Sequence, residues 1–229
     1  MSESQVPRRK RSFHSASVAV IGLGRFGSAL ALELVKGGHQ VLGIDTDEKI
    51  VQNLANDLTN VVTADTTDED TLRELGIAEM DSAVVAIGAD LESSILTTSL
   101  LLQLGVKTVW AKANSVAHGK ILHQLGTHKV IFPELEMGRR VAHQVSGESL
   151  DYVQIDEDFV MVKVECPESF DGKNLAELRI RAEHGVTVVA TSHQGAGYQP
   201  AFPETVLHSG DVLVVAGRKK PLDVFCQLS

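Results

Sequence analysis

The sequence predicts an α/β protein, in which a Rossmann-like, doubly wound parallel sheet is followed by a small α+β domain. Apolar strand-like runs alternate with helical patterns over the first half of the chain. A glycine-rich turn, Gly22-Leu-Gly-Arg-Phe-Gly27, separates the first run from the first helical pattern. Beyond about residue 150 the alternation gives way to strands with few helices between them, which indicates a second, smaller fold.

Six short apolar runs predict the strands of the first sheet. They lie at 18–21, 40–44, 61–64, 83–87, 108–111 and 129–132. Many of their residues are β-branched, which suits strands that are covered on both faces. Helical patterns lie between them, and those at 93–104 and 118–125 are each followed by a glycine that can end a helix. Strands that alternate with helices form a parallel sheet with helices on both faces.

The segment 150–229 predicts the small α+β domain. Strands are expected at 152–155, 160–165, 186–191 and 211–217, helices at 175–181 and 221–228, and a turn-rich loop at 194–200. A domain of about 80 residues has a small core, so we expect self-association to stabilise it.

The predicted organisation has four parts: a basic tail at 1–15, a nucleotide-binding domain at 16–133, a linking helix at 134–149 and the small domain at 150–229. The tail contains Pro7-Arg-Arg-Lys-Arg11 and is expected to be disordered, although a basic arm that touches anionic lipid or a partner is an alternative. Pro133 suits the start of the linking helix, which is expected to end near Gly147.

Composition narrows the class of protein. The 229 residues carry a formal net charge of −9, which argues against a broad basic surface for nucleic acid. No apolar run approaches a membrane span, and the N-terminus has no apolar signal-peptide core. The two cysteines, Cys166 and Cys226, show no metal-ligand spacing, so a reduced, cytoplasmic protein is expected.

The glycine-rich turn follows the dinucleotide-binding pattern G-x-G-x-x-G. Gly22 permits the tight turn, Gly24 lets a phosphate approach the backbone, and Gly27 lets the helix pack on the strand. The helix that starts here offers N–H groups and its positive dipole end to phosphate. Together with Arg25 and Phe26, these glycines are the first candidate contacts.

Arg25 and Asp45 refine the expected ligand. A guanidinium group inside the glycine turn suits an additional phosphate and favours ATP or ADP over NAD. The alternative is a solvated arginine, which the helix dipole disfavours slightly. Asp45 ends the second strand, where it can accept hydrogen bonds from two ribose hydroxyls and would repel the 2′-phosphate of NADP.

Further candidate contacts lie where the other strands are expected to end, because ligands of such sheets bind at the carboxyl ends of the strands. They are Thr46, Asp47, Asp65, Thr66, Ile87, Gly88, Ala89, Lys112, Ala113 and Asn114. Loop polarity or helix capping is an equally good explanation for each, above all for Asp47 and Asp65.

Two other features bear on chemistry. Glu134 and Glu136 follow the sixth strand and could hold a cation shared with a triphosphate, but the helix dipole alone accounts for acids at this position. The small domain shows no catalytic constellation, so we do not expect an enzyme. An NAD-dependent oxidoreductase remains an alternative and would need a paired acid and base.

At this point the chain resembles a known family, the KtrA-type regulatory RCK (KTN) subunits of Trk/Ktr potassium transporters. The resemblance runs from Ser17 to Leu228. The motifs that carry it are Val20-Ile-Gly-Leu-Gly-Arg-Phe-Gly27, Gly88-Ala89 before a Ser/Thr/Leu-rich helix, Trp110-Ala-Lys-Ala113, Pro133-Glu-Leu-Glu-Met-Gly138, Arg181-Ala-Glu-His-Gly185 and Pro203-Glu-Thr-Val-Leu-His-Ser-Gly-Asp211.

The resemblance implies a cytoplasmic gating subunit at the inner face of the cell membrane, with no nucleic-acid partner. It implies homodimers that assemble into an octameric ring on a membrane K⁺ translocator, with ATP and ADP holding the ring in different shapes. An NAD(H)-sensing regulator of the Trk branch is the alternative within the family.

The resemblance also assigns residue roles. Arg25 resembles the arginine that reaches the ATP γ-phosphate, within one subunit or from its neighbour. Thr46 and Asp47 join Asp45 as ribose and adenine contacts. His118 and the residues at the ends of the third, fourth and fifth strands match other nucleotide contacts.

Three further implications concern a cation, a departure from the family and a second ligand. Glu134 resembles the acid that binds an activating cation, for which Mg²⁺, Ca²⁺ and Na⁺ are candidates. Asp65 replaces a more neutral residue expected near adenine. The family also binds cyclic di-AMP in its C-terminal domain, and Leu175, Arg181 and Val186 are compatible with that ligand.

Overall fold

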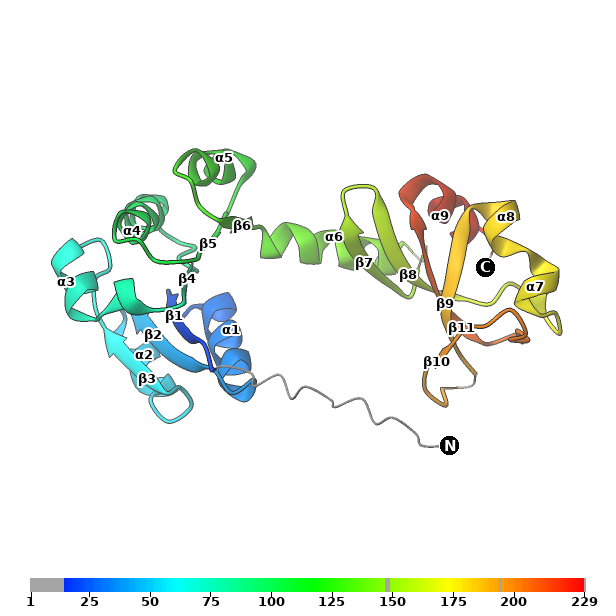
Figure 1. Ribbon diagram of the computed structural model, residues 1–229, viewed down its shortest axis with the longest axis horizontal. Helices are drawn as coiled ribbons and strands as arrows, with labels where there is room; N and C mark the ends of the chain where they lie inside the picture. Colours follow the sequence, from blue (N-terminus) through cyan, green and yellow to red (C-terminus); the bar gives the residue numbers. More distant parts are fainter. Residues whose placement is uncertain (1–14, 147–148, 194, 229) are drawn as a thin grey trace, which may run out of the picture. The chain divides into compact units, whose positions relative to one another are not determined.

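The computed structural model describes residues 15–146, 149–193 and 195–228 and divides into two compact units, Met1–Pro133 and Glu134–Ser229 (Figure 1). The expected basic tail, apart from Ser15, lies outside the described residues, as does the expected helix end near Gly147. Within the described ranges, no helix has both the length and the apolar character that crossing a membrane requires.

The first unit alternates strands and helices as predicted. Its strands are β1 (Ser17–Ile21), β2 (Gln40–Asp45), β3 (Asn60–Thr63), β4 (Ser82–Val85), β5 (Val109–Lys112) and β6 (Lys129–Ile131). Its helices are α1 (Arg25–Lys36), α2 (Glu48–Leu54), α3 (Glu69–Glu74), the 3₁₀ helix η1 (Ile77–Glu79), α4 (Leu91–Gln103) and α5 (Val116–Gln124). The sequence prediction did not include α2, which Asp47 caps by accepting the backbone N–H of Lys49.

The six strands form one parallel sheet in the order β3-β2-β1-β4-β5-β6. Because side chains alternate along a strand, β1 supplies both cores: Val18 and Val20 pack with the residues of α1 and α2, and Ala19 and Ile21 with those of α3, α4 and α5. The predicted doubly wound fold is therefore confirmed. The strand order reverses between β1 and β4, where such folds bind their ligands.

The second unit begins with α6 (Pro133–Val145) and continues as a small α+β fold. Its strands are β7 (Asp151–Asp156), β8 (Phe159–Glu165), β9 (Val186–Ser192), β10 (Gln199–Pro200) and β11 (Val212–Arg218), paired antiparallel in the order β10-β9-β11-β8-β7. Its shorter helices are η2 (Glu168–Phe170), α7 (Leu175–Leu178), α8 (Ile180–His184) and α9 (Lys219–Cys226). Leu222 and Phe225 of α9 belong to the same buried core as the valines of β8.

Two expectations for this unit are corrected. The single helix expected at 175–181 is broken at Arg179, whose φ of 46° lies in the left-handed region, so α7 and α8 are separate short helices. The loop expected at 194–200 contains the strand β10 at its end, which pairs with Thr191 and Ala190 of β9.

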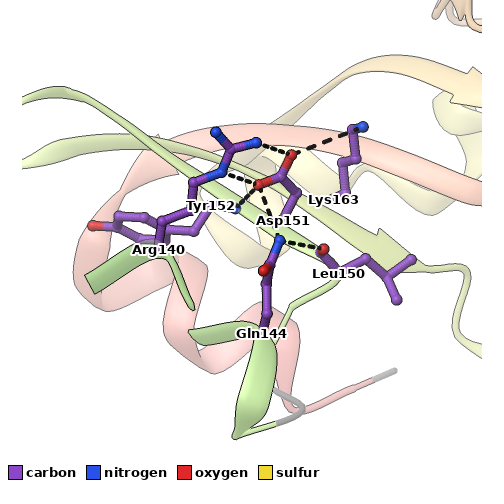
Figure 2. A network of polar contacts seen from close by, with 6 residues as sticks. All are labelled: Arg140, Gln144, Leu150, Asp151, Tyr152 and Lys163. Atoms are coloured by element: carbon purple, nitrogen blue, oxygen red, sulfur yellow. Dashed lines mark hydrogen bonds and ion pairs between the residues drawn. The ribbon is translucent and has the colours of Figure 1, made fainter. Parts of the chain in front are cut away.

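Helix α6 is tied to the second sheet by a polar network (Figure 2). The Arg140 guanidinium donates to both carboxylate oxygens of Asp151, at 2.7 and 2.9 Å. The side-chain amide of Gln144 donates to the Leu150 carbonyl at 3.2 Å. This pairing lowers the pKa of Asp151 and raises that of Arg140, because each charge stabilises the other.

Candidate functional site

The glycine turn after β1 is packed so closely that two of its glycines cannot carry a side chain. A Cβ at Gly27 would lie 1.8 Å from the carbonyl oxygen of Gly22. A Cβ at Gly22, whose φ is +88°, would lie 2.9 Å from the backbone nitrogen of Ile87. The turn therefore brings the start of α1 against both β1 and the end of β4.

The N-terminus of α1 is open where the turn meets the helix. Gly24 occupies the N-cap position, none of the described side chains caps the helix there, and its first turn contains no acid. A Cβ at Gly24 would meet nothing within 4 Å. Arg25, the first helical residue, is exposed and has no polar partner among the described residues. Unpaired N–H groups, a positive dipole end and a free guanidinium make this a place for an anion.

Asp45 lies against this turn. Its Oδ2 accepts the backbone N–H of Leu23 at 2.6 Å, and its Oδ1 accepts that of Asp47 at 2.9 Å. A carboxylate oxygen has a second lone pair, so these contacts hold the side chain in place and leave acceptor capacity for ribose hydroxyls. Sequence analysis missed the backbone contact of Leu23 and the Ser28 hydroxyl, which donates to the Leu23 carbonyl.

The ends of β4 and β5 meet on the other side of the switch point. The side-chain amide of Asn114 donates to the Gly88 carbonyl. The Lys112 ammonium lies 3.2 Å from where a Cβ of Gly88 would be, although most of the lysine is buried. Ile87 borders Gly22, as described above, and Ala89 is exposed beyond Gly88. The structure thus brings these predicted residues of two strands together.

Besides Gly27 and Lys112, three predicted contacts are buried: Thr66, Ala113 and His118. Thr66 pairs its hydroxyl with that of Thr97 at 2.9 Å, a partner that sequence reasoning missed. Ala113 belongs to the core, and its N–H donates to the Ile131 carbonyl. His118 is 1% exposed, its Nδ1 accepts the Asn114 N–H at 3.3 Å, and its Nε2 finds no partner in the described chain. Burial lowers the pKa of His118 and favours the neutral ring.

The remaining predicted residues differ in position. Thr46, Asp47 and Asp65 are exposed at the ends of β2 and β3, and Phe26 is half-buried in α1. Glu134 lies in the exposed first turn of α6 and belongs to the second unit. No cluster of three or more His, Cys, Asp or Glu side chains suited to a metal ion occurs in the part of the chain that the structure describes.

The second unit contains a hollow of ≈ 400 Å³ on its own surface. Leu175, Arg181 and Val186, the residues that sequence analysis associates with a second ligand, all line it. Arg179 and Phe202 line it too, and sequence analysis named neither. Arg179 is exposed and has a left-handed backbone, with a φ of 46°.

Comparison with known proteins identifies the family. The TrkA-N domain matches residues 18–133, and the TrkA-C domain matches residues 159–229. The chain is 37% identical over 208 residues to the Ktr system potassium uptake protein A of Bacillus subtilis (strain 168), covering 90% of this chain and 94% of that one. The chain belongs to the KtrA-type RCK family of Trk/Ktr potassium transport.

Solved structures share the fold of this chain. The match to the crystal structure of the GsuK RCK domain covers 97% of this chain and 48% of the GsuK chain, with a TM-score of 0.65 and 19% sequence identity. The match to the GsuK channel bound to NAD covers 97% of this chain and 40% of the channel chain, with a TM-score of 0.64 and 19% sequence identity. This RCK chain spans about half of those longer chains or less, and the likeness concerns the fold alone.

Proposed function

We propose that this chain is the cytoplasmic regulatory subunit of a potassium uptake system, which binds ATP and ADP in its first unit and controls a membrane K⁺ translocator. The observation that carries the proposal is the uncapped N-terminus of α1, with exposed Arg25, directly beside the fixed carboxylate of Asp45. Such a constellation suits a phosphate chain followed by a ribose. Close similarity to a Ktr potassium uptake protein supports the regulatory role over an enzymatic one.

The switch depends on the difference between the two nucleotides. A ligand shifts an equilibrium between two shapes only if it binds one of them more tightly. ATP carries a γ-phosphate that the Arg25 guanidinium can hold, within its subunit or across a subunit boundary, and ADP lacks it. A coupling of roughly 1–3 kcal/mol per site is sufficient for regulation when several sites act together.

A homodimer that assembles into an octameric ring is the proposed state of the regulator. An exposed apolar row on α6 supports self-association: Met137, Val141 and Val145 follow one another at intervals of four residues and are 54%, 44% and 83% exposed, and α6 has no buried residue among those described. An amphipathic helix of this kind gains stability when a partner covers its apolar face. The ring itself and its place at the inner face of the membrane follow from the family resemblance.

The proposed cation at Glu134 needs more oxygen ligands than Glu134 itself supplies. A single carboxylate does not make a site for Mg²⁺ or Ca²⁺, which take six or more oxygen ligands. Phosphate oxygens and a second subunit would have to supply the others. The described residues of one chain hold no cluster of three or more His, Cys, Asp or Glu side chains for a metal ion, so we derive no step of the switch from this cation.

Cyclic di-AMP is the proposed second ligand, and the hollow of the second unit supports it. Two exposed arginines, Arg179 and Arg181, stand at an apolar floor that includes Leu175 and Val186. Guanidinium groups suit phosphodiesters, and apolar surface suits the faces of adenine rings. No detectable binding of cyclic di-AMP to the full-length protein would count against this part of the proposal.

The test is calorimetric titration of the purified full chain with ATP, ADP and NADH. The wild type is expected to bind ATP and ADP, and Arg25→Ala is expected to weaken ATP roughly tenfold and ADP much less. Arg73→Ala removes an exposed arginine of α3 that pairs with Glu69 and serves as the matched control. Equal losses for ATP and ADP would refute the γ-phosphate role of Arg25.

Two outcomes would favour the alternatives instead. If NADH displaces ATP at an NADH concentration below that of ATP, the protein is an NAD(H)-sensing regulator. The GsuK channel, which has a similar fold, has been solved with NAD bound. Turnover of NADH with a carbonyl substrate would indicate the NAD-dependent oxidoreductase.

A further inference from the structure

We infer that the Ser28 hydroxyl aims the Gly24 N–H at the inner phosphates of the bound nucleotide, and that Ser28 does so without touching the ligand itself. This inference rests on the proposed nucleotide site and assigns Ser28 to it as a positioning residue. Ser28 is half-buried and lies one turn into α1. The proposed phosphate position lies in front of the first residue of that helix, so any effect of Ser28 on a phosphate passes through the glycine turn.

The Ser28 hydroxyl reaches back to that turn. A serine hydroxyl inside a helix usually donates to a carbonyl three or four residues earlier. The hydroxyl of Ser28 instead donates to the carbonyl of Leu23, which is five residues earlier and precedes the N-cap of α1. The Gly24 carbonyl, four residues before Ser28, accepts the backbone N–H of Ser28 at 2.9 Å. The side chain therefore holds a group of the glycine turn, while the backbone of Ser28 continues the helix.

This hydrogen bond fixes the peptide group that joins Leu23 to Gly24. The C=O and N–H of a trans peptide point in opposite directions. Because the Leu23 carbonyl points toward Ser28, the Gly24 N–H points away from it. Gly24 is exposed, and its N–H meets no acceptor among the described residues. This N–H is available to a phosphate oxygen in front of the helix.

The preceding peptide is fixed from the other side of the turn. The Leu23 N–H donates to Oδ2 of Asp45 at 2.6 Å. Leu23 is 1% exposed, so water does not readily replace either of its side-chain partners. Both polar backbone groups of this one residue thus depend on side chains, with Asp45 holding the N–H and Ser28 holding the carbonyl.

Without the hydroxyl, the peptide between Leu23 and Gly24 can turn over. The turned peptide would present the Leu23 carbonyl oxygen to the phosphates, whose negative charge repels it. Turning carries the φ of Gly24 from −63° into the positive range, which glycine adopts at little cost. A Cβ at Gly24 would meet nothing within 4 Å, so close packing does not hold this backbone either. The restraint comes from the hydroxyl of Ser28.

The test is calorimetric titration of the full chain with ATP and ADP, together with urea unfolding. Ser28→Ala is expected to weaken both nucleotides equally and roughly tenfold, because both carry the inner phosphates and a hydrogen bond to a charged group is lost. Arg25→Ala, by contrast, is expected to weaken mainly ATP. Ser28→Ala should unfold at the same urea concentration as the wild type or a higher one, since alanine favours the helix.

Two further variants complete the experiment. Ser28→Thr keeps the hydroxyl and is expected to bind both nucleotides within about twofold of the wild type. Ser146→Ala is the matched control, because it removes an exposed serine hydroxyl that donates to the His143 carbonyl in the other unit. It is expected to leave both affinities unchanged.

Several results would overturn the role of Ser28 while the nucleotide site stands. They are unchanged affinities in Ser28→Ala, a loss for ATP that exceeds the loss for ADP, a loss that only follows a fall in stability, and no recovery in Ser28→Thr. If the wild type binds neither nucleotide, the proposed function fails and this inference fails with it.

Discussion

The two units carry two different kinds of proposed phosphate site. In the first unit the site is mainly backbone: a glycine turn, the N-terminus of α1 and a carboxylate held by the Leu23 N–H. In the second unit the hollow is made by side chains, with Arg179 and Arg181 over apolar residues. The first site depends on close packing that one methyl group can destroy, whereas the second depends on charges that can be removed one at a time.

The two units also differ in how exposed their ion pairs are. In the second unit the Asp151 carboxylate is 17% exposed and receives both Arg140 donors. In the first unit the Asp81 carboxylate is 47% exposed and pairs with Lys107 at 2.8 Å. Screening by water weakens the more exposed pair. The two units should therefore respond differently to substitution and to acid, which four experiments can examine.

The largest effect is expected for Gly27→Ala. The added Cβ would lie 1.8 Å from the Gly22 carbonyl oxygen, and because this neighbour is backbone, it cannot move aside as a flexible side chain could. We expect loss of ATP binding in calorimetry and a decrease of about 3 kcal/mol in the free energy of unfolding, measured with urea. Gly138→Ala is the control, because a Cβ there meets nothing within 4 Å. It should stabilise α6 by roughly 0.5–1 kcal/mol. A Gly27→Ala protein as stable as the wild type would contradict the close packing described here.

The next effect separates the two sites. Arg181→Ala is expected to weaken cyclic di-AMP binding roughly tenfold and to leave ATP affinity unchanged, because the hollow and the glycine turn belong to different units. Arg25→Ala should show the reverse pattern. Titration of both variants with both ligands measures this. If either substitution weakens both ligands to the same extent, the two sites are not independent.

Asp151→Asn tests the bracing of the second unit. We expect a loss of about 1 kcal/mol in the free energy of unfolding at pH 7, since the carboxylate is mostly buried but Arg140 remains partly exposed. The pKa of Asp151 is lowered in the folded state, so its contribution is present above its unfolded pKa of about 3.9 and is lost as pH falls below that value. Urea midpoints of both proteins should therefore converge in acid. Parallel pH profiles would show that the carboxylate charge does not matter.

The smallest effect is expected for Asp81→Asn in the first unit. Hydrogen bonds from Lys107 and Ser17 lower the pKa of Asp81 to about 2, but its exposure limits what the pair contributes. The variant should be slightly less stable than the wild type at pH 7, with the difference disappearing as pH falls from about 4 toward 2. Thermal unfolding over this range measures it. A larger loss for Asp81→Asn than for Asp151→Asn would invert the proposed contrast.

The fold of the first unit was predictable because its signals are local and redundant. Each strand carries its own apolar run, and Gly22 marks the first turn, whereas α2, which Asp47 caps, was not predicted. In the second unit the break at Arg179 was not predictable. A left-handed arginine has no sequence signal, and only the packing around it makes that backbone favourable.

The candidate site divides in the same way. The roles predicted for the glycines and Asp45 follow from backbone geometry at fixed spacings, and the structure places these residues together at the start of α1. For Thr66, Ala113 and His118 the sequence predicted ligand contacts, but the structure buries all three side chains. A residue at a strand end can point to the ligand or into the core, and sequence position does not decide which.

The sequence by itself determined the alternating fold, the glycine turn with its two indispensable glycines, and the family. Local hydrophobic periodicity and the steric freedom of glycine are properties of the residues themselves. Only the tertiary structure decided which strand-end residues stay exposed, and that Arg179 and Arg181 line one hollow of the second unit together with Phe202. Burial and the hollow depend on contacts between segments distant in sequence, and such contacts exist only once the core has formed.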